Sequence, residues 1–334
     1  MTVRFAVLGA GRIGKVHAGA IAANPGARIV AVADAMAPAA EALAAQAGAE
    51  VRTIDAIEAA SDVDAVVICT PTDTHADLIE RFARAGKAIF CEKPIDLDVA
   101  RVKSCLAVVG ETGAKLMVGF NRRFDPHFRA VRKAIEDGAV GDVEMVTIVS
   151  RDPGAPPVDY IKRSGGIFRD MTIHDFDMAR WLLGEEPTVV AAFASNLVDS
   201  AIGKAGDFNS ANVLLETPSG RQAVITNSRR ATYGYDQRIE VLGSKGMVAA
   251  ENQRDVSIEI ANGAGFTRPP LLDFFMTRYT SAYAAEIATF VAGVTDGGAI
   301  APTGEDGLKA LALAEAAVRS VAEGRKIKVA DVIG

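Results

Sequence analysis

A short apolar segment that runs directly into a glycine-rich turn constrains the fold of this chain more than any other feature. The residues Phe5-Ala6-Val7-Leu8 precede Gly9-Ala10-Gly11-Arg12-Ile13-Gly14, which has the pattern Gly-x-Gly-x-x-Gly. A strand followed by such a turn and then by a helix is typical of a dinucleotide-binding βαβ unit. The sequence therefore predicts a nucleotide site at the start of the chain.

Each glycine of this turn has its own predicted role. Gly9 allows the tight turn, Gly11 lets the backbone approach a pyrophosphate, and Gly14 lets the helix pack closely on the strand. The helix that begins near Arg12 and Ile13 directs its free N–H groups toward the phosphates. These five residues form the predicted phosphate-binding part of the site.

Asp34 ends the next predicted strand, 20 residues after Gly14. A carboxylate at that point accepts hydrogen bonds from the adenosine ribose hydroxyls and repels a 2′-phosphate. Its neighbours Ala35 and Met36 carry no cation to offset this repulsion, although Arg12 lies close in sequence. NAD is therefore the predicted cofactor, in preference to NADP or a flavin.

The pattern of elements predicts two kinds of sheet. As far as residue 120, β-branched segments alternate with Ala-rich amphipathic ones, which predicts a Rossmann fold with a doubly wound parallel sheet. Its predicted strands are 3–8, 28–33, 64–69, 87–91 and 115–119. Its predicted helices are 12–23, 38–47, 74–85 and 98–112.

The pattern changes after Phe120, where the sequence predicts an α+β domain with a large, mainly antiparallel open sheet packed on helices. Its predicted strands are 143–151, 187–195, 209–216, 221–228, 236–242 and 246–260. Its predicted helices are 126–137, one that carries Asp170 and ends at Leu183, 280–294 and 304–323, with Thr303 or Asp306 as caps of the last.

Length and composition narrow the class of protein. With 334 residues we expect two domains, a Rossmann NAD-binding domain at 1–120 and a substrate-binding and oligomerisation domain at 121–334. A net charge of -6 without a long basic segment argues against nucleic acid as a partner. We expect no membrane association, because the sequence shows neither a leader nor an apolar segment of about 20 residues. Cys69, Cys91 and Cys105 are expected to be buried thiols in a reducing compartment, so we expect a cytoplasmic protein.

Two polar segments follow predicted strands at the carboxyl edge of the parallel sheet, where such folds bind ligands. Thr70, Thr72 and His75 follow the third strand and are predicted cofactor contacts. Between them, Asp73 or Thr74 is expected to cap the next helix. In the second segment, Glu92-Lys93-Pro94, the proline ends the strand and holds Lys93 where the nicotinamide is expected. The alternative for Lys93 is a solvated charge.

Asp170 and His174 lie one helical turn apart in the sequence, a spacing suited to proton transfer with a substrate hydroxyl. The alternatives are a carboxylate at a helix N-terminus for Asp170 and a packed histidine for His174. Asp175 and Asp177 complete an acidic cluster. No metal site is predicted, because four residues along one short helix do not all face one point.

Four motifs together resemble the Gfo/Idh/MocA oxidoreductases, and the resemblance covers essentially the whole chain. They are Gly9–Gly14, Glu92–Pro94, Gly119–Phe124 and Gly165–Asp177. Further segments are most similar to the inositol 2-dehydrogenases of that family, namely Ser150–Pro153, Asp159–Ile161, Asp170–Arg180 and Tyr233–Asp236. The resemblance implies NAD-dependent oxidation of myo-inositol to 2-keto-myo-inositol (scyllo-inosose). The alternatives are another inositol isomer or a sugar as substrate, or a nucleotide-binding regulator without turnover.

The resemblance also implies roles for three residues. Lys93 matches the lysine that binds the reacting hydroxyl, and Asp170 and His174 match an Asp-x-x-x-His pair with the histidine as general base. The chemistry agrees, since the hydroxyl must lose its proton as hydride leaves, and imidazole has a pKa of about 6.5. Lys93 would stabilise negative charge on the oxygen, and Asp170 would orient the substrate or the imidazole.

Other polar residues are weaker predictions. The remaining predicted cofactor contacts are Glu92, Asn121 and Arg122. The remaining predicted substrate contacts, in loops or at a strand start, are Arg123, Asp152, Tyr160 and Tyr235. Mixed donors and acceptors suit a neutral polyol or sugar, although the arginines are equally compatible with surface charge. An open sheet face is a predicted assembly surface, and the resemblance favours a homotetramer.

Overall fold

The computed structural model describes residues 2–334, which form two compact units. Unit 1 comprises Met1–Asp125 and Ser281–Leu311, and unit 2 comprises Pro126–Thr280 and Ala312–Gly334. The chain therefore passes between the units three times, whereas the sequence prediction placed a single boundary at residue 120. No helix among residues 2–334 is both long and apolar enough to span a membrane.

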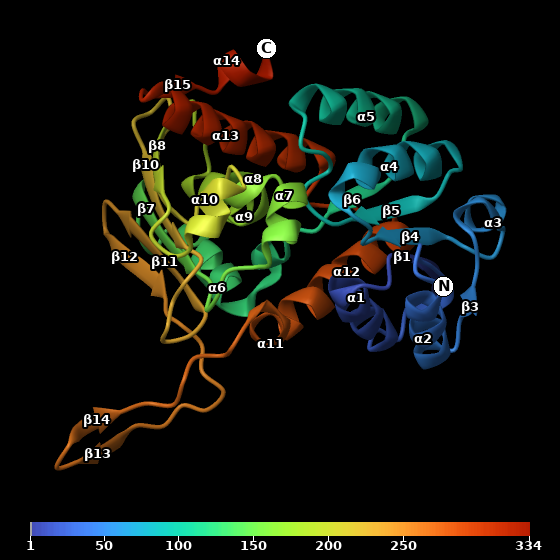
Figure 1. Ribbon diagram of the computed structural model, residues 1–334, viewed down its shortest axis with the longest axis horizontal. Coiled ribbons are helices and arrows are strands. Elements are labelled where there is room, and N and C mark those ends of the chain that lie inside the picture. Colours follow the sequence, from blue (N-terminus) through green and yellow to red (C-terminus); the bar gives the residue numbers. More distant parts are fainter. Residues whose placement is uncertain (1) are drawn as a thin grey trace. The chain divides into compact units, whose positions relative to one another are not determined.

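Unit 1 is built on a six-stranded parallel sheet, which confirms the predicted Rossmann fold (Figure 1). The strand order is β3-β2-β1-β4-β5-β6. The strands are β1 (Val3–Leu8), β2 (Ala27–Ala33), β3 (Glu50–Val51), β4 (Ala65–Ile68), β5 (Ala88–Cys91) and β6 (Leu116–Val118). The connections run in opposite directions from β1 and β4, so their carboxyl ends form the crevice where this fold binds ligands.

Helices cover both faces of this sheet, as predicted. They are α1 (Arg12–Ala22), α2 (Ala37–Ala47), α3 (Ile54–Ala59), α4 (His75–Arg84), α5 (Val99–Thr112) and α12 (Thr280–Asp296). The sequence prediction missed the short elements β3 and α3. Helix α12 belongs to this unit because Phe290 packs on Phe5 of β1 and Phe90 of β5, each with ring centroids 5.9 Å apart.

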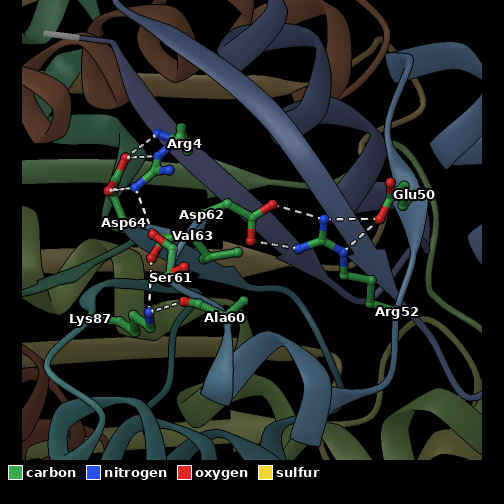
Figure 2. Close-up of polar contacts among 9 residues, drawn as sticks. All are labelled: Arg4, Glu50, Arg52, Ala60, Ser61, Asp62, Val63, Asp64 and Lys87. Carbon is green, nitrogen blue, oxygen red and sulfur yellow. Dashed lines mark hydrogen bonds and ion pairs between the residues drawn. The ribbon is translucent and has the colours of Figure 1, made fainter.

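Charged side chains join the strands of this sheet to the segments between them (Figure 2). Arg4 of β1 donates to both carboxylate oxygens of Asp64, at 2.9 and 2.7 Å, just before β4 begins. Arg52, directly after β3, forms two hydrogen bonds of 2.8 Å with Asp62. Lys87 donates to the carbonyl of Val63 at 2.9 Å. These contacts join β1 and the end of β3 to the segments that lead into β4 and β5.

Unit 2 contains a seven-stranded mixed sheet in the order β12-β11-β7-β10-β9-β8-β15. Its strands are β7 (Val143–Arg151), β8 (Val189–Ser195), β9 (Ser210–Glu216), β10 (Gln222–Ser228), β11 (Asp236–Gly243), β12 (Gly246–Ala250) and β15 (Ile327–Lys328). Every neighbouring pair is antiparallel except β7 and β10. The predicted, mainly antiparallel sheet is therefore confirmed.

Several helices accompany this sheet. They are α6 (Pro126–Glu136), α7 (Val158–Ser164), α8 (Gly166–Asp170), α9 (Thr172–Leu183), α10 (Ser200–Lys204), α11 (Phe275–Arg278), α13 (Gly304–Glu323) and α14 (Ala330–Ile333). Helix α13 begins in unit 1 and ends in unit 2. At its start, the Thr303 hydroxyl accepts the Asp306 N–H and Asp306 Oδ2 accepts the Thr303 N–H, so Thr303 is the cap and Asp306 is its partner in the first turn.

Two predicted elements of unit 2 are wrong. The predicted strand 246–260 ends at Ala250, and a separate hairpin of β13 (Ile260–Asn262) and β14 (Gly265–Thr267) follows it (Figure 1). The predicted helix through Asp170 is divided at Met171, where the His174 N–H donates to the Met171 carbonyl, three residues back, at 3.4 Å. A local tightening of the backbone thus separates α8 from α9.

Candidate active site

The glycine turn of unit 1 has the backbone geometry that its sequence predicts. Gly9 has a φ of +97°, and a Cβ there would lie 2.6 Å from the Cys69 carbonyl. A Cβ on Gly14 would lie 2.0 Å from the Gly9 oxygen, whereas a Cβ on Gly11 would meet nothing within 4 Å. Gly11 is also the exposed N-cap of α1, followed by Arg12 and Ile13. The turn is therefore closed on the protein side and open where a pyrophosphate binds.

Asp34 lies directly beside this turn. Its two carboxylate oxygens accept hydrogen bonds from the Ala10 N–H at 2.6 Å and from the Met36 N–H at 2.7 Å. A carboxylate can accept about four hydrogen bonds, so Asp34 retains capacity for ribose hydroxyls. The residues present thus fit the adenosine half of NAD.

The loops after β4 and β5 are joined by His75. Its ring nitrogens lie 2.8 Å from the carbonyl oxygens of Pro94 and Thr70. Burial lowers the pKa of His75, although both carbonyl contacts act in the opposite direction. His75 therefore holds the loop that carries Lys93, and the Lys93–Pro94 peptide is cis.

The threonines beside His75 differ in part from their predicted roles. Thr70 and Thr74 share a hydrogen bond of 2.6 Å between their hydroxyls. Thr74 occupies the N-cap position of α4, but its hydroxyl donates to the Pro71 carbonyl at 2.7 Å, so the predicted side-chain cap is wrong for Thr74. Thr72 begins a short 3-10 helix and is partly exposed.

Glu92 has a partner that the sequence prediction missed. Its Oε1 lies 2.6 Å from Nε2 of His17, which is fully buried in α1. The His17 ring also makes edge contacts with Phe90 and with Tyr283 of α12. The signal available in the sequence was spacing, because His17 follows Gly14 by one helical turn and so faces the same sheet.

The residues after β6 are held by the protein itself. Asn121 and Arg122 are buried in the 3-10 helix Asn121–Phe124. Arg123 forms an ion pair of 2.9 Å with Asp306 at the start of α13. Arg123 therefore joins the segment after β6 to α13, a role that the sequence did not predict.

Unit 2 places two of the predicted substrate residues in contact. The Tyr160 hydroxyl donates to Asp170 Oδ1 at 2.9 Å. Tyr160 lies in helix α7, so its predicted position in a loop is wrong. Asp170 ends α8, and His174 lies in the first turn of α9 and is partly exposed.

A buried polar network fixes the start of α9 against the sheet. The Thr172 hydroxyl donates to Asn227 Oδ1 at 2.7 Å, and Asn227 donates to Asp175 Oδ2 at 2.8 Å. Asp175 is fully buried, so its role is to hold the helix rather than to contact a ligand. Among residues 2–334, no group of three or more metal-binding side chains is placed to hold an ion.

The other two predicted substrate residues lie at strand ends of the same unit. Asp152 directly follows β7, is partly exposed, and has backbone hydrogen bonds to Ser228 and Ala231. Tyr235 directly precedes β11 and is 6% exposed, with its ring packed edge-on against Phe274. Asp152 is thus open to a ligand, whereas only a small part of Tyr235 is.

Comparison with known families agrees with this arrangement. Residues 3–120 match the model of an oxidoreductase family with an NAD-binding Rossmann fold, and residues 128–249 match the GFO/IDH/MocA C-terminal domain. The chain belongs to the GFO/IDH/MocA oxidoreductase family. Its cofactor is accordingly NAD, as Asp34 predicts.

Individual relatives resemble the chain over its full length. It is 76% identical over 330 residues to an inositol 2-dehydrogenase of Rhizobium meliloti (strain 1021), covering 99% of this chain and 100% of the relative. The crystal structure of a putative myo-inositol dehydrogenase from Sinorhizobium meliloti 1021 matches with a TM-score of 0.97 and 76% identity, covering 98% of this chain and 100% of that one. A scyllo-inositol dehydrogenase from Lactobacillus casei with bound NAD(H) and scyllo-inositol matches with a TM-score of 0.92 and 30% identity, covering 99% and 100%.

Proposed function

We propose that this protein oxidises one ring hydroxyl of myo-inositol with NAD, giving 2-keto-myo-inositol (scyllo-inosose). The observation that carries the proposal is the 76% identity to an inositol 2-dehydrogenase over 99% of this chain, which includes both units. The chemistry of the candidate residues supports it, since hydroxyl, carboxylate and ammonium groups together suit a neutral polyol.

The proposed roles follow from what the reaction requires. NAD, when bound, accepts the hydride from the ring carbon. His174 takes the proton of the reacting hydroxyl, and Lys93 stabilises the negative charge that develops on its oxygen. Asp170, with Tyr160 bonded to one of its oxygens, orients the substrate or the imidazole of His174.

Turnover of myo-inositol, followed by NADH absorbance, tests this proposal. We expect His174→Ala to lower kcat about 10²- to 10⁴-fold, because the general base is lost. Lys93→Met is expected to lower it about 10²- to 10³-fold. His127→Ala and Lys162→Met change exposed residues of the same types and serve as controls. Full activity in both site variants would overturn the assigned roles.

The substrate itself requires a separate experiment. The Lactobacillus casei relative was crystallised with scyllo-inositol, so that isomer is the second candidate. A panel of myo-inositol, scyllo-inositol and aldoses, each with NAD and with NADP, distinguishes them. We expect the highest kcat/KM for myo-inositol with NAD. A tenfold preference for another compound would assign the protein to that substrate.

We also propose that the protein is a homotetramer, as the outer face of the unit 2 sheet suggests. Leu214 and Val224 lie side by side on this face, and Leu214 is 51% exposed. The row continues through apolar, small or polar side chains on the neighbouring strands, namely Ala191, Thr147, Glu240 and Ala249. A row with one charged side chain, Glu240, and exposed apolar ones is suited to a second copy of the same chain.

The β13–β14 hairpin provides a second surface for assembly. All six of its residues are exposed, and Phe266 is 78% exposed. A two-stranded hairpin is marginally stable by itself, so a contact with another copy would stabilise it. A tetramer with dihedral symmetry needs at least two different interfaces, which the face and the hairpin would supply.

Light scattering tests the two surfaces separately. We expect wild-type protein to have the mass of four chains, Phe266→Ser that of two, and Val224→Lys to disrupt the sheet-face contact. A single-chain mass for the wild type would overturn the proposal.

We also propose that the protein works in the cytoplasm. All three of its cysteines are free and buried, as expected for a reducing compartment.

A further inference from the structure

Arg229, which directly follows β10, is the largest of the fully buried side chains in the described part of the chain. Its side chain is 1% exposed, so it does not bind a ligand from solvent. A buried guanidinium is costly unless carboxylates compensate its charge. The role of Arg229 therefore depends on the carboxylates that lie next to its guanidinium.

Two carboxylates face this guanidinium. Arg229 Nη2 lies 3.3 Å from Oδ2 of Asp207 and 3.8 Å from Oδ2 of Asp170. The other oxygen of Asp170 accepts the Tyr160 hydroxyl, so both oxygens of this carboxylate have a neighbour in unit 2. Arg169, which precedes Asp170 in α8, pairs with Glu315 of α13 instead.

Asp207 connects the guanidinium to the opposite end of the same short helix. Its Oδ1 accepts the Ile167 N–H at 2.9 Å, at the beginning of α8. A Cβ on Gly166 would lie 2.6 Å from that oxygen, and Gly166 has a φ of +82°, so only glycine fits there. The three charged groups thus fix the first and the last residues of α8.

We propose that Arg229 is a positioning residue for Asp170, which it holds in place, with Asp207 as the anchor of the guanidinium. The inference rests on the proposed role of Asp170 in binding the substrate. The guanidinium attracts both carboxylates, and the anchored helix end limits the motion of Asp170. A displacement of about 1 Å in such a group costs on the order of 10²-fold in rate.

Steady-state kinetics with myo-inositol and NAD test the inference. We expect Arg229→Met to lower kcat/KM for myo-inositol on the order of 10²-fold, with KM for NAD unchanged. Arg229→Lys keeps the charge and should recover at least tenfold of this loss. Arg230→Met, the same change at the exposed neighbouring residue, is the matched control.

A double-mutant cycle distinguishes positioning from a general structural effect. In an Asp170→Asn background, Arg229→Met should change kcat/KM less than twofold, because its target is already lost. An equal loss in both backgrounds would overturn the inference while leaving the role of Asp170 intact. Unchanged turnover in Asp170→Asn alone would instead overturn the proposed function of Asp170. If Arg229→Met does not fold, Arg229→Lys in the same two backgrounds decides, and an equal loss in both again overturns the inference.

Discussion

Two fully buried carboxyl groups, Glu286 of α12 in unit 1 and Asp236 of β11 in unit 2, have opposite electrostatic environments. Burial raises the pKa of Glu286 well above its usual value, and the nearby charge of Glu92 adds to this effect. Within residues 2–334, neither oxygen of Glu286 has a hydrogen-bond partner. The surroundings of Glu286 therefore favour its neutral form.

Asp236 is equally buried but remains charged. Burial acts to raise its pKa, but hydrogen bonds from Arg238, Tyr233 and Asn252 outweigh it and lower the pKa below its usual value. The Arg238 Nε and Asn252 Nδ2 atoms both lie 2.7 Å from its Oδ1. The comparison shows that donors around a carboxyl group, rather than its depth, determine whether it keeps its charge.

Removal of the charge from Asp236 should have the largest effect on stability. We expect Asp236→Asn to lower the free energy of unfolding by about 3 kcal/mol, because it removes the negative charge beside Arg238 and replaces one acceptor oxygen by an NH2 group that faces another donor. This loss is at the low end of the range for a broken buried ion pair, because Arg238 is 39% exposed and solvent can hydrate its guanidinium. Urea unfolding at pH 7 measures it. A loss below about 1 kcal/mol would show that solvent replaces the donors' partner.

Replacement of Glu286 should change the pH dependence of stability. Because the pKa of Glu286 is higher in the folded than in the unfolded protein, its neutral form contributes fully to the free energy of unfolding below about pH 4.3, and this contribution falls as the pH rises toward the folded pKa. Glu286→Gln does not titrate and so avoids this loss. The free energy of unfolding of the variant should therefore rise relative to that of the wild type by about 1.4 kcal/mol per pH unit in that window. Urea unfolding from pH 5 to pH 8 tests the slope, and a constant difference would mean that Glu286 is already ionised.

Removal of one donor to Asp236 should have the smallest effect. Tyr233→Phe deletes a hydrogen bond of 2.5 Å to Asp236 Oδ2 and should cost about 1 kcal/mol at pH 7. The loss should shrink as pH falls through the lowered pKa of Asp236, because a protonated carboxyl group no longer needs the donor. Thermal unfolding at a series of pH values from 7 downward follows this loss. A loss that grew as the pH fell would contradict the charged state assigned to Asp236 at pH 7.

Local patterns predicted the parallel sheet, the glycine turn and Asp34, because each depends on a few consecutive residues. The partners of buried charges could not be predicted in this way. Arg229 lies 59 positions from Asp170 in the sequence, and only the pairing of β10 with β7 and β9 brings it to α8. The division of the helix at Met171 was also missed, since its apolar periodicity continues through that residue.

The interleaved order of the two units has a consequence for how the protein is made. The parallel sheet is complete by Val118, but its cover includes Ser281–Leu311, so Phe290 reaches Phe5 only after most of the chain has been synthesised. Domains usually fold as units, the N-terminal one first, as they leave the ribosome. In this protein, the first strand to leave the ribosome belongs to a unit that cannot be completed until residues 281–311 have been synthesised. A fragment that stops at residue 125 would expose the apolar surface that α12 covers in the full-length protein.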